Sequence, residues 1–243
     1  MGHSPGLEYI LTLIVPLFNE EGNLPRLVRE LSEYLSATSY KTKVLLVNDG
    51  STDGSQKLIE EYCAASDAFN FITLQNNGGL STALKAGIDQ VETRFTGYMD
   101  ADLQTTPFDI DLLMEYAELY ELVSGIRVGR QDGLIKRMTS KIANAIRRAV
   151  THDGAEDTGC PLKVFHTEVA RRIPFFKGMH RFLPALVQLG GGKVKMVPVR
   201  HFKRLAGQSN FRLLNRLVGP AVDLIAFIWM RKRAIRYKIV AKG

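Results

Sequence analysis

The first half of the chain alternates between short hydrophobic runs and longer segments in which apolar positions recur every three or four residues. The hydrophobic runs predict β-strands at residues 10–18, 43–49, 69–75 and 95–100. The segments with helical spacing predict helices at residues 23–37, 54–65 and 80–91. Strands that alternate with helices form a mostly parallel sheet covered by helices, so the pattern predicts an α/β fold.

The second half of the chain is less regular. After Pro107 the pattern predicts a short helix, then a strand at residues 120–127 and a basic helix over about 134–150. Further on we expect a strand at 160–165, a helix around 181–189, a strand at 193–202 and a helix from about residue 211. We find no internal repeat or low-complexity linker. We therefore expect one domain at residues 8–210, followed by a C-terminal helical extension at 211–243.

Polar clusters follow three of the predicted strands. "FNEE" follows the first strand, "NDGSTD" the second and "DADLQ" the fourth. Ligands of open parallel sheets bind at the carboxyl ends of the strands. The chain has neither G-x-G-x-x-G after its first strand nor G-x-x-x-x-G-K-[ST], which disfavours a nicotinamide dehydrogenase and a P-loop nucleotidase. The pattern instead indicates a nucleotide bound through carboxylates and a metal ion.

The stretch "YMDADLQTTP" places Asp100 and Asp102 one residue apart at the end of a strand. On a continuing strand the two acids would share one face and repel each other. If the chain leaves the strand through a turn, both can face one divalent cation, with Gln104 adding an oxygen. Mg²⁺ and similar cations take few carboxylates together with substrate phosphates. The alternative is a simple strand-end turn in which Asp102 caps the helix after Pro107.

Composition and charge narrow the range of partners. The chain has 243 residues, of which 45% are hydrophobic and 23% charged, as in a globular protein. Its net charge of +7, concentrated late in the sequence, indicates an anionic partner such as nucleic acid, a membrane surface or a phosphorylated substrate. Its two cysteines have no paired spacing, which argues against a zinc site or a disulfide framework and fits a reducing compartment. The N-terminal hydrophobic run lacks the features of a signal peptide.

The combined motifs resemble the family 2 glycosyltransferases, which have a GT-A fold with a Rossmann-like sheet. Within that family the chain is similar to the polyprenyl-phosphate glycosyltransferases, the branch of dolichol-phosphate mannose synthase. The superfamily motifs are "IVPLFNEEGNL", "VNDGSTDGS", "NNGGLSTALKAGI" and the DXD motif within "MDADLQTTP". The motifs of the lipid-phosphate branch are "SGIRVGR", "DTGCPLKVF", "HRFLPAL" and "RHFKRLAGQSNF".

The resemblance implies a site for the donor, a UDP- or GDP-sugar. Pro16, Phe18, Glu20 and Asp49 match the positions that hold the nucleoside, with Asp49 accepting a hydrogen bond from the base. Asp100, Asp102 and Gln104 match the positions that bind Mg²⁺ or Mn²⁺, and Asp102 is the expected catalytic member of this set. The glycine pair that begins at Gly78 lets the backbone pass close to the nucleotide before a helix whose N-terminus favours anions.

The acceptor implied by the resemblance is a phosphate monoester, which is already ionised at neutral pH. Such a nucleophile must be held rather than deprotonated, and Arg offers two parallel hydrogen bonds to it. Arg127 and Arg204 match positions that handle phosphates near the reaction centre. The full set of candidate phosphate ligands is Arg127, Arg130, Lys136, Arg204 and Ser209. Arg130 and Lys136 have the alternative of being solvated surface charges.

Asp157, in "EDTGC", occupies the position where hydroxyl-using relatives place a catalytic base. In the lipid-phosphate branch it can instead orient an arginine or the donor sugar. We therefore predict a metal-dependent, inverting transfer of a sugar from a nucleotide diphosphate sugar to a polyprenyl phosphate. The alternative in the same fold is transfer to a hydroxyl of a glycan or glycolipid in cell-envelope polysaccharide synthesis.

Two other classes of protein share some of these features. A nucleotidyltransferase uses carboxylates and Mg²⁺, but it needs basic residues around a triphosphate, and "VPLFNEEGN" is acidic. A nucleic-acid-binding module would explain the basic charge but has no need of the aspartate pair. We therefore expect no nucleic acid partner.

The C-terminal segment "LVGPAVDLIAFIWM" is strongly apolar and is followed by the basic "RKRAIRYK". It is shorter than the roughly 20 apolar residues that cross a bilayer. An apolar segment with a Trp and a basic tail suits the interface of an anionic leaflet. We expect peripheral attachment to the cytoplasmic face of the cell membrane. The alternative is a helix that packs on the domain with a solvated basic end.

Overall fold

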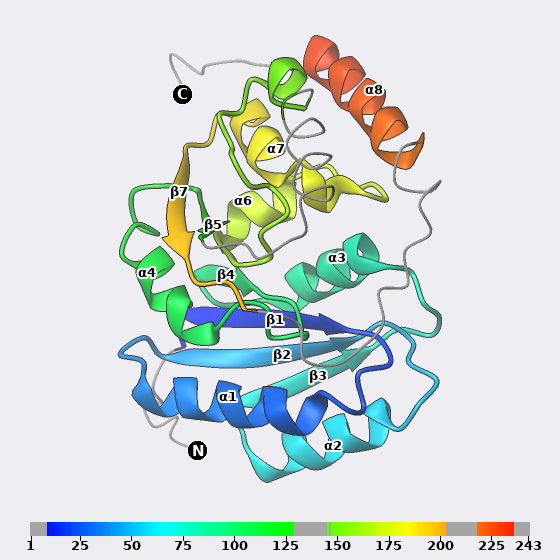
Figure 1. Cartoon of the computed structure of the whole chain (residues 1–243), viewed down its shortest axis with the longest axis vertical. Helices are drawn as coiled ribbons and strands as arrows, with labels where there is room; N and C mark the ends of the chain where they lie inside the picture. Colours follow the sequence, from blue (N-terminus) through cyan, green and yellow to red (C-terminus); the bar gives the residue numbers. More distant parts are fainter. Residues whose placement is uncertain (1–8, 129–144, 146, 203–217, 236–243) are drawn as a thin grey trace, which may run out of the picture.

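The computed structural model describes residues 9–128, 145, 147–202 and 218–235. Its strands form one sheet in the order β3-β2-β1-β4-β6-β5-β7 (Figure 1). The strand β6 is antiparallel to β4 and β5, and every other neighbouring pair is parallel, which confirms the predicted α/β fold. The strands are β1 (Leu11–Leu17), β2 (Thr42–Asn48), β3 (Phe69–Thr73), β4 (Phe95–Tyr98), β5 (Leu122–Arg127), β6 (Lys163–His166) and β7 (Val194–Val199).

Helices cover both faces of the sheet. In Figure 1, α1 and α2 lie below β1–β3, while α3 lies above them and α6, α7 and α8 are stacked further up. The helices are α1 (Leu24–Ala37), α2 (Ser55–Ala65), α3 (Leu80–Gln90), α4 (Ile110–Met114), α6 (Thr167–Arg172), α7 (Leu183–Leu189) and α8 (Val218–Arg233). Two 3₁₀ turns, η1 (Pro107–Asp109) and η2 (Met179–Arg181), precede α4 and α7.

The core explains why the first strand is a continuous hydrophobic run. Leu13 and Val15 of β1 belong to the buried cluster that includes α1. Ile14, which points to the other face, belongs to the cluster that includes Leu84 and Ile88 of α3. A strand that is buried on both faces has apolar residues at successive positions rather than at alternate ones.

Most of the predicted elements are confirmed, with differences in the second half. The helix α6 was not predicted, because its six residues, TEVARR, are too few to show a helical period. The predicted basic helix over about 134–150 lies mostly outside the described residues, although residues 147–151 are helical. The predicted C-terminal helix is present as α8, and the proposed boundary at residue 210 also lies outside the described part of the chain.

The helix α8 packs against the domain by one side. Phe227 is 1% exposed, and its ring stacks on that of Phe182 with 5.8 Å between the centroids. At the start of the helix, Arg181 Nη1 lies 3.3 Å from Asp223 Oδ2. Within the ranges that the structure describes, no helix combines the length and the hydrophobicity needed to span a membrane.

Candidate active site

The loops that follow β1 and β2 are bonded to each other at the carboxyl edge of the sheet. Asn19, with a left-handed φ of 55°, receives a hydrogen bond at Oδ1 from the Thr52 amide at 2.8 Å. The Asn19 amide donates to Ser51 Oγ at 2.9 Å, and the Glu20 amide donates to Ser55 Oγ at 3.0 Å. Two polar clusters that are some thirty residues apart in sequence are therefore joined by hydrogen bonds at this edge.

The predicted nucleoside residues lie along this edge. Pro16 is buried within β1 and pairs in register with Val47 of β2. Phe18 and Glu20 follow the strand and are partly buried. The structure thus brings Pro16, Phe18 and Glu20 close to the end of β2, where Asp49 begins the second loop. Their contact with a nucleoside stays a prediction.

Asp49 has two backbone partners that the sequence did not predict. Its Oδ1 and Oδ2 each accept a hydrogen bond at 2.8 Å, from the amides of Gly78 and Gly79 respectively. Gly79, with φ 81°, lies directly before α3, so the amides expected near a phosphate are donating to this carboxylate. An ionised carboxylate has about four acceptor positions, so Asp49 retains capacity to accept from a base.

The turn expected after β4 is present. The strand ends at Tyr98, and Leu103 has a left-handed φ of 53°. The Gln104 amide donates to Asp102 Oδ1 at 3.1 Å, and the Tyr98 hydroxyl donates to Asp100 Oδ1 at 2.6 Å. Asp100 and Asp102 both follow the last residue of β4, so their carboxylates do not lie together on one face of a continuing strand.

The alternative prediction, that Asp102 caps the helix that begins at Pro107, is wrong. The cap of η1 is Thr106, whose side chain accepts from the Phe108 amide at 3.4 Å. Asp102 is too early in the chain for this role, and its Oδ1 instead closes a local turn with Gln104.

The electrostatics at Asp100 suit a cation. Burial, and then the negative charge of Asp102, raise the pKa of Asp100 to about 6, while Lys163 and Arg127 act in the opposite direction. In the described part of the chain, no group of three or more His, Cys, Asp or Glu side chains could hold a metal ion by themselves. The carboxylates of Asp100 and Asp102 and the side-chain amide oxygen of Gln104 are suitable ligands for a hard divalent cation. Such a cation would complete its shell with phosphate oxygens and water.

Arg127 and Asp157 form a two-pronged ion pair across thirty residues of sequence. Arg127 Nε donates to Asp157 Oδ2 and Nη2 donates to Oδ1, both at 2.8 Å. The Arg127 amide also donates to Oδ2 at 3.2 Å. A Cβ at Gly159 would lie 3.0 Å from Arg127 Nη2, so glycine allows the loop to pack closely on the guanidinium. The arrangement matches the expectation that Asp157 orients an arginine.

Lys163 lies near the predicted site residue Asp100 but was not itself predicted from the sequence. It is 1% exposed and pairs in register with Tyr98 of β4 and Ser124 of β5. Its Nζ donates to the carbonyls of Thr158, at 3.4 Å, and Cys160, and lies 5.8 Å from the centre of the Tyr98 ring. Burial lowers the pKa of Lys163. The available signal was a single charge within the apolar strand "CPLKVF".

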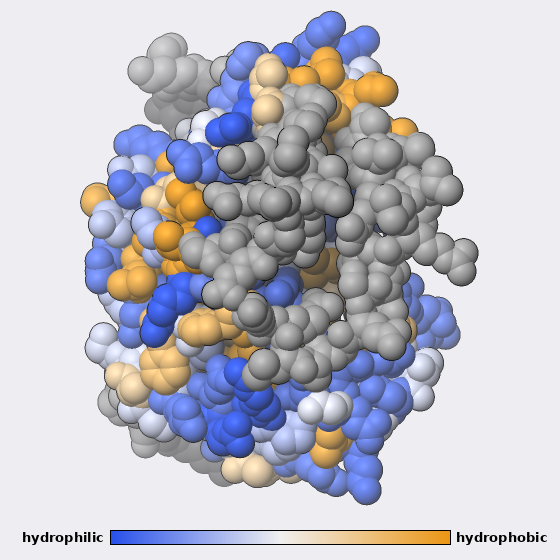
Figure 2. All heavy atoms as spheres, viewed as in Figure 1, coloured by the Kyte–Doolittle hydropathy of each residue, from blue (hydrophilic) through white to orange (hydrophobic). Residues whose placement is uncertain are grey.

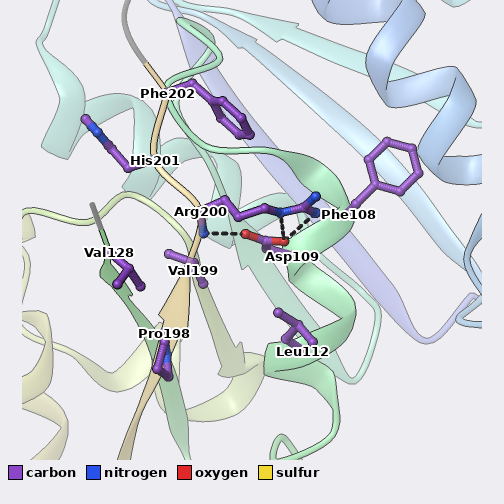
Figure 3. Close-up of a pocket in the computed structure, with 9 residues that line it drawn as sticks. All are labelled: Phe108, Asp109, Leu112, Val128, Pro198, Val199, Arg200, His201 and Phe202. Atoms are coloured by element: carbon purple, nitrogen blue, oxygen red, sulfur yellow. Dashed lines mark hydrogen bonds and ion pairs between the residues drawn. The ribbon is translucent and has the colours of Figure 1, made fainter. Parts of the chain in front are cut away.

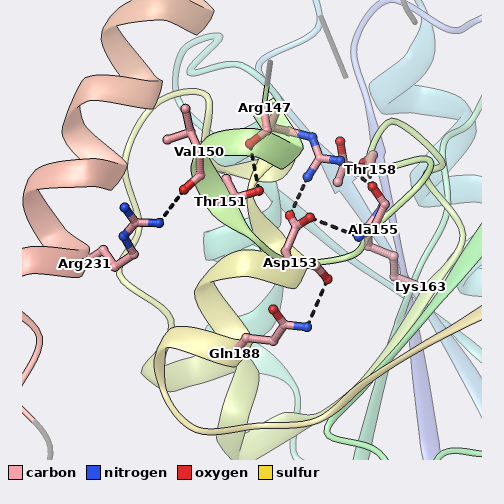
Figure 4. Close-up of polar contacts among 9 residues, drawn as sticks. All are labelled: Arg147, Val150, Thr151, Asp153, Ala155, Thr158, Lys163, Gln188 and Arg231. Carbon is pink, nitrogen blue, oxygen red and sulfur yellow. Dashed lines mark hydrogen bonds and ion pairs between the residues drawn. The ribbon is translucent and has the colours of Figure 1, made fainter. Parts of the chain in front are cut away.

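A second buried ion pair supports the loop that carries Asp157. Arg147 donates to Asp153, whose side chain is 0% exposed, and also to the Ala155 carbonyl (Figure 4). The Ala155 amide donates back to Asp153 Oδ1 at 3.0 Å, and Gln188 Nε2 donates to the Asp153 carbonyl at 3.1 Å. The loop between residues 153 and 160 is therefore held by buried polar contacts along its length.

Several predicted acceptor residues lie outside the described ranges. These are Arg130, Lys136, Arg204 and Ser209. Their roles stay predictions that rest on the sequence.

The family was identified by comparison with known proteins. The model of "Glycosyl transferase family 2" matches residues 12–177. This chain belongs to that family. Its fold is therefore that of a glycosyltransferase, as the motifs indicated.

Curated relatives resemble the chain over most of its length. It is 31% identical over 234 residues to the dodecaprenyl-phosphate galacturonate synthase of Rhizobium johnstonii, covering 94% of this chain and 68% of that protein. It is 30% identical to the undecaprenyl-phosphate 4-deoxy-4-formamido-L-arabinose transferase of Pseudomonas fluorescens, covering 89% of this chain and 64% of that protein. The chain thus spans about two thirds of the length of these relatives.

Solved structures share the GT-A fold. The glucosyl-3-phosphoglycerate synthase of Mycobacterium tuberculosis, in complex with Mg²⁺ and UDP, aligns with a TM-score of 0.69 at 15% identity, over 97% of this chain and 87% of that one. A mannosyltransferase of Pyrobaculum calidifontis, in complex with GDP-Man and Mn²⁺, aligns with a TM-score of 0.65 at 16% identity, over 96% of this chain and 66% of that one. At these identities the likeness shows the fold alone.

Proposed function

We propose that this glycosyltransferase moves a sugar from a UDP- or GDP-sugar to a polyprenyl phosphate, with inversion at the anomeric carbon. The observation that carries the proposal is the similarity, over 94% of the chain, to a dodecaprenyl-phosphate galacturonate synthase. The position of the polar loops at the carboxyl edge of the sheet supports the same reaction, because nucleotides bind at that edge in α/β folds.

In this proposal Asp100, Asp102 and Gln104 hold Mg²⁺ or Mn²⁺. When bound, such a cation neutralises the negative charge that develops on the departing diphosphate. Tyr98 keeps Asp100 oriented through its 2.6 Å hydrogen bond. The edge formed by Pro16, Phe18 and Glu20, together with Asp49, takes the nucleoside.

The paired state of Asp157 supports a phosphate acceptor rather than a hydroxyl. Both of its carboxylate oxygens accept from Arg127, so its main role in this arrangement is to orient that guanidinium. A phosphate monoester is already ionised at neutral pH and needs no base. We assign the acceptor phosphate to Arg127 together with Arg130, Arg204 and Ser209, of which the last three are proposed from sequence.

The exposed side of α8 supports attachment to a membrane surface. Val222, Ile225 and Trp229 are 59%, 67% and 62% exposed, and their spacing puts them on one face of the helix. Figure 2 shows hydrophobic atoms in this upper right region, where Figure 1 places α8. Lys232 and Arg233, both exposed, end the helix, while Arg231 donates to the Val150 carbonyl (Figure 4). We propose that this face lies in the interface of the cytoplasmic leaflet, where basic residues meet anionic lipids.

A transfer assay tests the proposal. The protein is incubated with a panel of UDP- and GDP-sugars, Mg²⁺ or Mn²⁺, and undecaprenyl phosphate in detergent or vesicles, and the glycolipid product is measured. We expect transfer from at least one donor, with no product from undecaprenol, the alcohol that lacks the phosphate. Efficient use of alcohols in place of the phosphate would instead establish transfer to a hydroxyl.

A further inference from the structure

An apolar pocket of about 610 Å³ lies between η1, α4 and the end of β7 (Figure 3). Its large apolar side chains are Phe108, Leu112, Val128 and Phe202, and each of them is exposed to solvent. Hydrophobic atoms gather in the same region on the left of Figure 2, over α4 and β7. The pocket is open to solvent, and a group of exposed apolar side chains of this kind is typical of an interaction site.

Two charged residues in the wall of this pocket, Asp109 and Arg200, form an ion pair. Asp109 is 1% exposed, and it accepts from the Arg200 amide at 2.7 Å, from Nε at 2.8 Å and from Nη2 at 2.6 Å. Figure 3 shows this pair on the wall, with the aromatic rings of Phe108 and Phe202 to either side. The Arg200 side chain is 60% exposed and His201 also lines the pocket, so the apolar residues share this wall with polar groups.

The pocket is connected through the backbone to the elements that carry the proposed site residues. The Phe202 amide donates to the Gln104 carbonyl at 2.9 Å, which connects the pocket to the turn that carries Asp102. Val128 directly follows Arg127, the residue paired with Asp157. Along the sequence, the predicted phosphate ligands Arg130 and Arg204 each follow a lining residue by two positions.

We propose that this pocket binds the first isoprene units of the acceptor lipid. The inference rests on the proposed function and adds to it the site that recognises the hydrocarbon chain. A phosphate held near Arg127 would place the attached prenyl chain beside Val128 and Phe202. Burial of the branched C5 units against these side chains removes apolar surface from water on both partners.

The test is a comparison of acceptor chain lengths. Isopentenyl phosphate carries one isoprene unit and farnesyl phosphate carries three, and both stay soluble without a membrane. We expect the wild type to prefer farnesyl phosphate by kcat/KM, and Leu112→Gln to reduce that preference about tenfold, mainly through KM, with unchanged affinity for the nucleotide sugar. Val128→Gln, on the opposite wall, should act in the same direction.

Leu119→Gln is the matched control, because Leu119 is also exposed and lies outside the pocket. It should retain the wild-type preference. Equal use of isopentenyl phosphate and farnesyl phosphate by the wild type would overturn the inference. So would an unchanged preference for farnesyl phosphate in both Leu112→Gln and Val128→Gln, provided that both variants bind the nucleotide sugar normally. If Leu112→Gln instead converts a dimer to a monomer in sedimentation, with preference unchanged, the pocket is a contact between copies and the inference is wrong.

The proposed function and this inference fail in different ways. If the wild type glycosylates no prenyl phosphate of any length, the proposed function fails. In that case the affinity for farnesyl phosphate, measured by calorimetry in the presence of UDP, still tests the pocket. Leu112→Gln should lower this affinity about tenfold. Binding that is absent in the wild type, or unchanged in the variant, would overturn the inference.

Discussion

The two halves of the molecule stabilise their functional loops by different means. In the donor half, β1 to β4, the loops are held by hydrogen bonds between neutral groups, as between Asn19 and both Ser51 and Thr52, and by carboxylates that accept from backbone amides, as Asp49 does from Gly78 and Gly79. The acceptor half uses buried charges, including Arg127 with Asp157 and Arg147 with Asp153. A neutral hydrogen bond contributes about 1 kcal/mol, whereas loss of one partner of a buried ion pair costs about 3 to 5 kcal/mol. The acceptor half should therefore be the more sensitive to single substitutions.

The largest effect on stability should come from Arg147→Met. It leaves the fully buried Asp153 carboxylate without its cation, and we expect the free energy of unfolding to fall by about 3 kcal/mol or more. In the donor half, Gln56→Ala removes an acceptor from Asn48 and should cost about 1 kcal/mol. Urea denaturation measures both. The double variant Arg147→Met/Asp153→Leu should recover most of the loss, and equal costs for the two single variants would contradict the comparison.

The largest effect on activity should come from the donor half. We expect Asp102→Asn, or chelation with EDTA, to lower the transfer rate at least about a hundredfold, because the diphosphate loses its counter-charge. Added Mg²⁺ or Mn²⁺ should restore the EDTA-treated wild type but not the variant. The matched control, Asp67→Asn in the exposed loop before β3, should have wild-type rates. Full activity in EDTA would refute the metal assignment.

Asp157→Asn separates an orienting role from a catalytic base. If Asp157 orients Arg127, the rate should fall roughly tenfold to a hundredfold by loss of the charge-assisted pair. The transfer rate of the variant should still fall as the pH is lowered through about 6, because this acid limb of the pH–rate profile follows the second ionisation of the acceptor phosphate. Loss of that limb in the variant would make Asp157 the base. A phosphonate acceptor, which has a higher second pKa, should move the limb upward and so exclude Asp100 as its origin.

The membrane face of α8 should have a more moderate effect. Trp229→Asp places a charge on the exposed side of the helix, and we expect about tenfold weaker partition to vesicles that contain anionic lipid. Transfer to farnesyl phosphate in solution should be unchanged. Leu119→Asp, a change at another exposed leucine, is the control in a vesicle sedimentation assay. Equal loss of partition in the control would argue against a specific role of α8.

The smallest effect should be a gain in stability from Asp100→Asn. Since the pKa of Asp100 rises from 3.8 to about 6, the folded state binds the proton more tightly than the unfolded state does. The wild type without metal should therefore lose stability as the pH rises from about 4 to about 6. At pH 8 the variant should be the more stable of the two proteins, while no difference is expected at pH 3. Thermal unfolding without added metal measures this, and a less stable variant at pH 8 would contradict it.

The strands and helices of the donor half could be predicted from the sequence. Hydrophobic runs and helical periods are local properties, so β1 to β4 and α1 to α3 could be placed within a few residues. The rule that parallel strands share one carboxyl edge brought the polar loops together. The turn at Asp100 and Asp102 was predictable because two neighbouring acids on one strand face would repel.

In the acceptor half the order of the strands and the pairing of charged side chains could not be predicted from the sequence. No local pattern reveals that β6 lies antiparallel between β4 and β5, and this register is what places Lys163 beside Tyr98. The partnership of Arg127 with Asp157 is likewise made across thirty residues of sequence. From sequence alone a charged side chain is expected at the surface, because burial removes its hydration. Burial is stable only when carbonyls or carboxylates replace that hydration, and these partners come from distant parts of the chain that the fold brings together.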